Sequence, residues 1–275
     1  MFIRSSMRRL RLTTAVGAVL MVLAACSGTP APETSVQPVP EVAQTTPTAA
    51  PSSNADTAAA AQAYFSALVT EDPDEDEAAS KDHAAPKSIA AAYAQHLANV
   101  RGADLDGGLS SDAEDLITEN GTYGYCPDGD TDSKDCVTWG DVQFSGGKVS
   151  TFTINKVDIS KRITLGSGDA VKAGKLADIT FLSAYQSVQS KAVFVALEVK
   201  TNKRAVTVIT YDSKYRDQSG HQRTATQEGG PSEIDADSTA RIYAAFKSVK
   251  PGGVLTLDVT DSKNYDTKTV KIKTS

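Results

Sequence analysis

The chain has 275 residues, 40% hydrophobic and 23% charged, with 28 basic and 34 acidic side chains and a net charge of −6. This length is enough for one large or two small domains. Nucleic-acid binding is favoured by clustered Lys and Arg, so nucleic acid is not expected as a partner of an acidic chain.

Residues 1–25 have the features of an export signal. Four arginines and no acidic residue precede an apolar stretch that runs from about Ala15 to Ala25. That stretch is too short for a bilayer core of about 30 Å, which needs roughly 20 apolar residues. The sequence therefore predicts a signal peptide over 1–25.

The end of this stretch, Leu23-Ala24-Ala25-Cys26, resembles the lipobox of bacterial lipoproteins. The resemblance implies cleavage before Cys26 and acylation of its thiol, which would anchor the protein to the extracytoplasmic face of the cell membrane. The alternative is an ordinary signal peptide with a cysteine at its end by chance. Removal of the four arginines leaves 24 basic against 34 acidic side chains, so the mature chain carries −10.

Residues 26–56 are expected to be a disordered tether after the lipidated Cys26. The segment consists mostly of Ser, Thr, Pro, Ala, Gln, Glu and Val, and it lacks the large apolar side chains that would offset the entropy of ordering.

Residues 57–158 are predicted to form a helical α+β portion with two to three helices and a hairpin. Tyr64 and Leu68 lie four apart on one expected helix. A second runs through Tyr93 and is entered at Ser88. A capping-box pattern predicts a third, short helix at 111–114. The acidic run at 71–77 is interpreted as a solvated helix start, with a cation site as the alternative.

The stretch WGDVQFSGGKVSTFTI, residues 139–154, predicts a β-hairpin with a Ser-Gly-Gly turn. Helices followed by such a hairpin resemble the start of NTF2-like α+β domains, and this resemblance covers about residues 56–158.

Residues 159–275 are predicted to be all-β. In VFVALEVK, residues 193–200, apolar side chains alternate along one face of a strand. The clearest strand patterns cover 176–188, 192–201, 205–211, 240–246, 254–260 and 267–273. Together they predict an antiparallel sandwich. Their order resembles the Ig-like domains of the DUF4352 type found on bacterial surface lipoproteins.

Cys126 and Cys136 form an even pair once Cys26 is assigned to lipid, and export places them where disulfides persist. A structural bridge is therefore expected rather than a redox site, which would need a closer pair and a lowered thiol pKa.

The loop between these cysteines contains alternating carboxylates that resemble the first ligands of an EF-hand calcium loop. They are Asp128, Asp130 and Asp132, and Asp135 could add a fourth ligand. Ser133 stands where that loop needs Gly, so a solvated polar turn is the preferred interpretation, and neither calcium nor any other cofactor is expected.

Patterns of catalytic residues are weak. Ser145 and Lys148 fit S-x-x-K, but two glycines between expected strands favour a turn. The three histidines show no zinc-binding spacing, and His96 and His221 are expected at the surface. We therefore predict no catalytic residues and no enzyme activity.

Two groups of aromatic residues remain. Tyr123, Tyr125 and Trp139 could line a shallow pocket, although packing beneath the disulfide is the preferred interpretation. Tyr211 and Tyr215, with His221 nearby, could form an interaction surface at one end of the sandwich.

The sequence thus favours a lipid-anchored, non-catalytic module that binds a protein or polymer of the envelope. The alternative is a ligand carrier or enzyme accessory with a pocket in the N-terminal α+β portion, and an envelope hydrolase is the third possibility. The sequence does not identify the partner.

Overall fold

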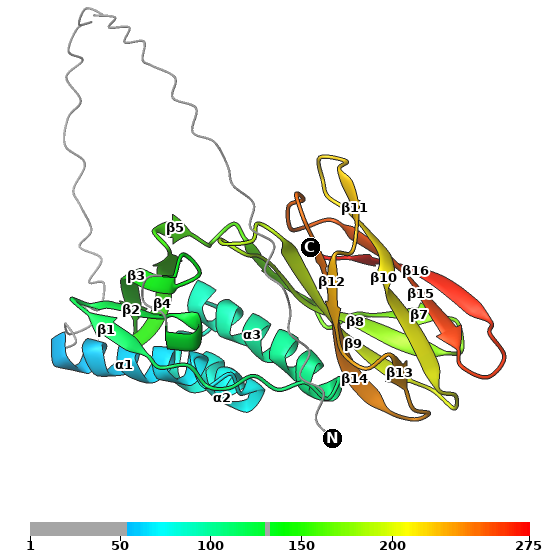
Figure 1. Ribbon diagram of the computed structural model, residues 1–275, viewed down its shortest axis with the longest axis horizontal. Helices are drawn as coiled ribbons and strands as arrows, with labels where there is room; N and C mark the ends of the chain where they lie inside the picture. The colour runs from blue at the N-terminus through cyan, green and yellow to red at the C-terminus, as the bar shows by residue number, and fades with distance from the viewer. Residues whose placement is uncertain (1–53, 130–132) are drawn as a thin grey trace, which may run out of the picture. The chain divides into compact units, whose positions relative to one another are not determined.

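The computed structural model describes residues 54–129 and 133–275 (Figure 1). Its helices are α1 (Asn54–Leu68), α2 (Pro73–Ala78), the π-helical turn η1 (Ala79–His83), α3 (Ile89–Asp106) and the 3-10 turn η2 (Pro127–Gly129). Among these helices, none is both long enough and apolar enough to cross a bilayer. Cys26 and the predicted tether up to residue 53 lie outside the described residues, whereas residues 54–56, also assigned to the tether, already belong to α1.

The helix starts follow the local sequence. The Asp72 side chain accepts a hydrogen bond from the Asp74 backbone N–H at 2.9 Å and caps α2, with Pro73 in the first turn. Ser88 caps α3 in the same way, because its Oγ accepts from the Ala91 N–H at 3.1 Å. Tyr64 and Leu68 are fully buried on α1. The predicted apolar stripe of α1 therefore faces a core.

The prediction of a helix at 111–114 is wrong. Residues 109–116 have no regular secondary structure, and the Glu114 N–H donates to the Val69 carbonyl at 2.8 Å. A capping box stabilises only a helix whose next turns bury an apolar stripe, and this short acidic segment offers none. The third helix is α2 instead, within the acidic run.

The first sheet has the order β1-β2-β3-β4-β5, and all neighbouring strands are antiparallel. Its strands are β1 (Ile117–Glu119), β2 (Thr122–Tyr125), β3 (Val137–Ser145), β4 (Lys148–Ile154) and β5 (Val157–Asp158). The predicted hairpin is β3 and β4, joined through Gly146 and Gly147, which both have positive φ. The N-terminal part is therefore α+β, as expected from the sequence.

The remaining strands form an antiparallel β-sandwich. They are β6 (Ile163–Leu165), β7 (Ala170–Ala173), β8 (Ala177–Gln186), β9 (Val193–Thr201), β10 (Val206–Arg216), β11 (Gln222–Thr224), β12 (Gln227–Gly229), β13 (Glu233–Ile234), β14 (Thr239–Phe246), β15 (Val254–Asp261) and β16 (Thr267–Lys273). One layer has the order β12-β14-β9-β8-β6, with β7 also on β8. The other has the order β11-β10-β15-β16, with β13 also on β10.

This order is that of an immunoglobulin-like sandwich. β8, β9, β14 and β12 take the places of strands A, B, E and D, while β10, β15 and β16 take those of C, F and G. The two layers enclose a core of aliphatic side chains that includes Val195, Leu197, Val208 and Leu257, with Phe246 and Tyr215. All six strands predicted from the sequence are present as β8, β9, β10, β14, β15 and β16.

Aromatic rings fill the core of the α+β part. The Phe65 ring stacks on Trp139 and on Tyr123, with centroids 5.0 and 4.7 Å apart. Residues after 158 also join this core, because Tyr185 from β8 packs its ring against Tyr93 of α3 at 5.3 Å. The two parts thus contact each other through packed side chains.

A buried ion pair holds α2 to α3. Nη1 of Arg101 lies 2.6 and 2.7 Å from the two carboxylate oxygens of Asp76, and its Nη2 lies 2.5 Å from Glu71. Asp76 is fully buried, so the prediction of a wholly solvated acidic run is wrong at this residue. Burial raises the pKa of Asp76 to about 7, and the Arg101 charge opposes that rise.

We expect Arg101→Met to lower the free energy of unfolding by about 3–5 kcal/mol, because it leaves the buried Asp76 carboxyl without its partner. Urea unfolding at neutral pH measures the change. The matched control is Lys81→Met, which removes an exposed ion pair with Glu77 and is expected to cost at most about 1 kcal/mol. Equal losses of unfolding free energy in the two variants would contradict this prediction, because the buried pair would then stabilise the fold no more than the exposed pair.

Candidate functional site

The structure joins Cys126 and Cys136 as a disulfide, with 2.15 Å between the two sulfur atoms. The bridge links the end of β2 to the start of β3 and closes the loop between these two strands. A covalent link of this kind stabilises the strand pair mainly by restricting the unfolded chain.

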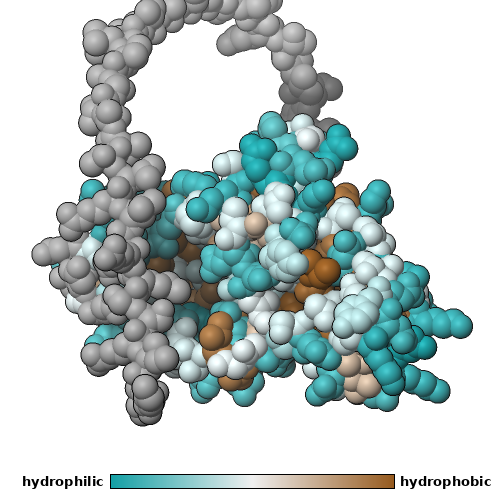
Figure 2. Space-filling model, turned by 45° about the vertical axis from the view of Figure 1, so that its right-hand side comes forward, coloured by the Kyte–Doolittle hydropathy of each residue, from teal (hydrophilic) through white to brown (hydrophobic). Residues whose placement is uncertain are grey.

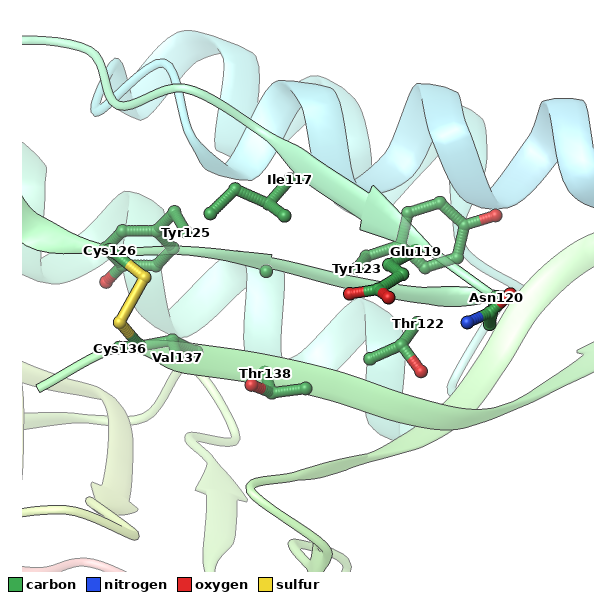
Figure 3. Close-up of a pocket in the computed structure, with 11 residues that line it drawn as sticks. Ile117, Glu119, Asn120, Thr122, Tyr123, Tyr125, Cys126, Cys136, Val137 and Thr138 are labelled. Carbon is green, nitrogen blue, oxygen red and sulfur yellow. A yellow bond between two sulfur atoms is a disulfide. The ribbon is translucent and has the colours of Figure 1, made fainter. Parts of the chain in front are cut away.

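A shallow groove of about 510 Å³ lies next to the disulfide on the outer face of β1, β2 and β3 (Figure 3). Ile117 stands over one side, Thr138 lies on the other, and Glu119 and Thr122 lie at the end away from the disulfide. Gly124 is part of the lining and lets β2 lie close to β3, because a Cβ there would lie 2.4 Å from the Val137 carbonyl oxygen. The groove is thus polar at one end and lined by sulfur and Ile117 at the other.

The aromatic residues near this groove belong mainly to the core. Trp139 is 1% exposed and Tyr123 is 6% exposed, and both rings stack on Phe65 of α1. Tyr125 is half-buried and tilts against Trp139 at 5.6 Å between centroids. Packing beneath the disulfide, the preferred interpretation from the sequence, describes these residues better than an exposed platform.

Most of the possible calcium ligands lie where the structure gives no side-chain position. Asp130 and Asp132 fall outside the described residues, as does the side chain of Asp128. Asp135 is exposed, and its carbonyl accepts from Gln189 Nε2 at 2.7 Å. Within the described ranges no group of three or more His, Cys, Asp or Glu side chains is placed to hold a metal ion.

Two weak catalytic patterns have structural explanations. Ser145 and Lys148 lie at the facing ends of β3 and β4, on either side of the hairpin turn. His96 is buried, contrary to the prediction, with Nδ1 2.9 Å from Ser183 Oγ, and burial lowers its pKa to about 3. It is therefore a neutral residue that links α3 to β8.

The predicted surface of Tyr211, Tyr215 and His221 is wrong in part. Tyr211 is 60% exposed, and His221 is exposed in the turn between β10 and β11. Tyr215 is fully buried, where its ring stacks on Phe246 and its hydroxyl accepts from the Gly253 N–H at 2.8 Å. The pairing of β10 with β15 shifts between Ile209 and Lys214, and this bulge moves Tyr215 to the inner face.

A second candidate site lies at the end of the sandwich opposite the turn that carries His221. Three connections meet there: the B–C turn (residues 202–205), the D–E segment (230–238) and the F–G loop (262–266). They surround a hollow of about 660 Å³ whose polar lining includes Arg204, Glu233, Lys263 and Asn264. We call this region the loop end of the sandwich.

Asp261 organises the loop end. Its carboxylate is fully buried and accepts from the backbone N–H groups of Lys263 and Asn264 at 2.9 and 3.0 Å. It also accepts from Nη1 of Arg204, in the B–C turn, at 2.6 Å. The Asn264 N–H and then the Arg204 guanidinium hold the pKa of Asp261 well below its usual range. One carboxylate therefore fixes two of the three connections.

The F–G loop presents an aromatic side chain to solvent. Tyr265 is 81% exposed, the highest value among the large hydrophobic residues in the described part of the chain. Its backbone has φ +58°, and its N–H donates to the Asp261 carbonyl at 2.9 Å. An exposed tyrosine on an ordered turn gives large contact area with little loss of conformational entropy on binding.

Sequence reasoning missed the loop end. The stretch DSKNYD, residues 261–266, lies between two predicted strands and contains Asp and Asn, which favour turns. That signal identifies the turn, but it does not show that Arg204, 57 residues earlier, shares the Asp261 carboxylate.

Comparisons with known proteins add little. No family model and no curated protein matches the sequence. Among solved structures, the GAE domain of yeast GGA1 has 6% identity and a TM-score of 0.27, covering 39% of this chain and 98% of that one. A protein from Listeria monocytogenes, described as functionally unknown, has 9% identity and a TM-score of 0.27, covering 42% and 90%. Similarities of this size say nothing about function.

We expect Asp261→Asn to lower the melting temperature and to speed amide exchange at Lys263 and Asn264, because the amide carries no charge and its NH2 group would replace the oxygen that accepts from Arg204. The folded pKa of Asp261 lies below the unfolded value of about 3.9. Its stabilisation is therefore present above about pH 4 and is lost as the pH falls below that value.

Urea unfolding of the wild type and Asp261→Asn at neutral pH and near about pH 3 measures this dependence. The difference between the two proteins should narrow in acid. Asp266→Asn, which alters an exposed ion pair with Lys268, serves as the control. A difference that stays constant with pH would contradict the assigned role of Asp261.

Proposed function

We propose that this protein is a lipoprotein anchored to the extracytoplasmic face of the cell membrane, where it binds an envelope protein or polymer without catalysing a reaction. Tyr265, held on the Asp261-ordered loop at 81% exposure, is the observation that carries the binding role. Loops on a rigid β scaffold often carry recognition, and in immunoglobulin variable domains the B–C and F–G loops do so.

The anchoring part of the proposal rests on the sequence at Cys26. The disulfide between Cys126 and Cys136 supports it, because such bonds persist in oxidising compartments outside the cytoplasm. The surface seen in Figure 2 is mostly hydrophilic, with hydrophobic residues in small separate areas. A lipid anchor would attach the protein to the membrane without requiring an apolar patch on this face (Figure 2).

The groove beside the disulfide supports the alternative, an accessory role for the α+β part. Its lining of Thr122, Thr138 and Glu119 suits a polar ligand better than a hydrophobic one. The interior of this part is filled by stacked rings such as Phe65 and Trp139, so a carrier of hydrophobic molecules is less well supported. We therefore keep the loop end as the leading binding surface.

If Cys26 is acylated, its replacement should remove the lipid anchor. With Cys26→Ser, we expect no incorporation of labelled fatty acid and a shift of the protein from the detergent phase to the aqueous phase on Triton X-114 partition. Ser27→Ala, at the neighbouring residue, is the control and should behave like the wild type. Fatty-acid labelling of Cys26→Ser at the wild-type level would refute lipidation at this position.

Site-specific photo-crosslinking in intact cells tests the binding surface. A photoreactive residue in place of Tyr265 should give a discrete crosslinked product. The same residue in place of Tyr211, a tyrosine that is 60% exposed elsewhere on the sandwich, should give none. Crosslinks only from position 138, in the groove, would transfer the binding role to the α+β part. If neither position 265 nor position 138 gives a crosslink, both proposed binding surfaces are refuted.

A further inference from the structure

A cleft of about 830 Å³ lies next to the hollow at the loop end and shares Lys203 and Arg204 with it. The turn after β7 contributes Lys175, and the start of β16 contributes Lys268. Asp266 is the one carboxylate among the lining residues. We call this cleft, with its four cationic side chains, the basic cleft.

Hydrogen bonds from Asn202 connect two of the segments that carry these cations. The Asn202 N–H donates to the Leu176 carbonyl at 2.9 Å, and Asn202 Nδ2 donates to the Lys175 carbonyl at 3.3 Å. The stem of Lys268 passes Gly174, at 3.6 Å from the position that a Cβ would take there. The cations therefore lie on three neighbouring segments of the chain.

The cleft carries more positive charge than its own carboxylates neutralise. Lys268 pairs with Asp266 at 2.9 Å, and Arg204 pairs with Asp261 at 2.6 Å. Lys175 and Lys203 form no ion pair with any residue in the described ranges. This excess of positive charge occurs in a protein whose net charge is −6, so the cleft stands out as a place for an anion.

Arg204 adds a directional donor to these point charges. Its side chain is 57% exposed although one of its amino groups is held by Asp261. A guanidinium has five N–H donors in a planar fork, and this geometry matches the oxygens of a phosphoryl group, while lysines add charge without a fixed direction. Fixed Arg and adaptable Lys together suit a phosphate-bearing ligand.

We infer that the basic cleft binds a soluble ligand that bears several phosphate groups. The volume of about 830 Å³ is larger than one phosphate needs and lies within the range of small-molecule sites. A concave site can enclose a chain of phosphates, whereas the phosphates of a bilayer lie on a flat surface that does not enter a cleft. This inference rests on the proposed binding role of the loop end and names the chemistry that one part of that end recognises.

Tripolyphosphate is the probe. We expect titration of the lipid-free mature protein to shift the amide signals of residues 174–176 and 202–204 in heteronuclear NMR spectra. Lys175→Gln with Lys203→Gln should weaken binding at least about 10-fold, because two charge-assisted contacts are lost. Added salt should weaken wild-type binding as well, since the attraction is electrostatic.

The matched control changes two exposed lysines outside the cleft, Lys214→Gln with Lys247→Gln, and keeps the same net charge as the cleft variant. Binding by this control should stay within about twofold of the wild type. The amide spectra of both variants also show whether each is folded. Equal weakening in both variants would mean that overall charge, not the cleft, attracts the probe, and would overturn the inference.

Two further outcomes decide the source of the phosphate. Absence of wild-type binding at millimolar tripolyphosphate would overturn the inference, as would binding only to vesicles containing phosphatidylglycerol and not to the soluble probe. Crosslinking from Tyr265 does not depend on the cleft lysines. A crosslink at Tyr265 without tripolyphosphate binding would refute the phosphate ligand and leave the proposed function standing, while the reverse result would refute the Tyr265 surface alone.

Discussion

Helix α3 is rich in alanine, and its small side chains let two different sets of residues pack against it. Tyr93 enters the aromatic core of the α+β part, while Ala103 contacts Ala196 and Tyr243 on the outer face of the sandwich. Near the end of α3 the backbone of Gly107 approaches Gly230 so closely that a Cβ at position 107 would lie 3.0 Å from the Gly230 carbonyl. Larger residues would separate these surfaces, and the aromatic core would lose Tyr185.

Polar contacts give this packing a fixed register. Ser183 Oγ lies 2.9 Å from His96 Nδ1 and accepts from Asn99 Nδ2 at 3.0 Å, with all three residues buried. Asp106 also accepts from the Arg241 N–H at 2.6 Å. A buried polar group without a partner is costly, so a sliding α3 would lose these bonds before it lost apolar contact. The helix is thus positioned by hydrogen bonds as well as by shape.

Alternation of apolar residues was sufficient to predict the strands of the sandwich, because one face of each strand is buried. It failed where the backbone departs from a regular strand. Tyr211 and Tyr215 have even spacing, yet the bulge in β10 sends one outward and the other inward. The sequence did indicate the groove in part, since Tyr123 and Tyr125 were considered as pocket residues and both line it. The loop end depends on the contact between Asp261 and Arg204, and a pair so distant in sequence leaves no local pattern.

Asp261 connects the two surfaces of the loop end. Its carboxylate holds the N–H groups that shape the turn before Tyr265, and it also holds Arg204, which lines both the hollow and the basic cleft. Because the carboxylate is buried, its charge offsets Arg204 without occupying the surface that a ligand would contact. Because Asp261 holds one amino group of Arg204, the remaining N–H groups of the guanidinium have a fixed direction. A single buried acid therefore orders both the turn that presents Tyr265 and the Arg204 side chain that lines the basic cleft.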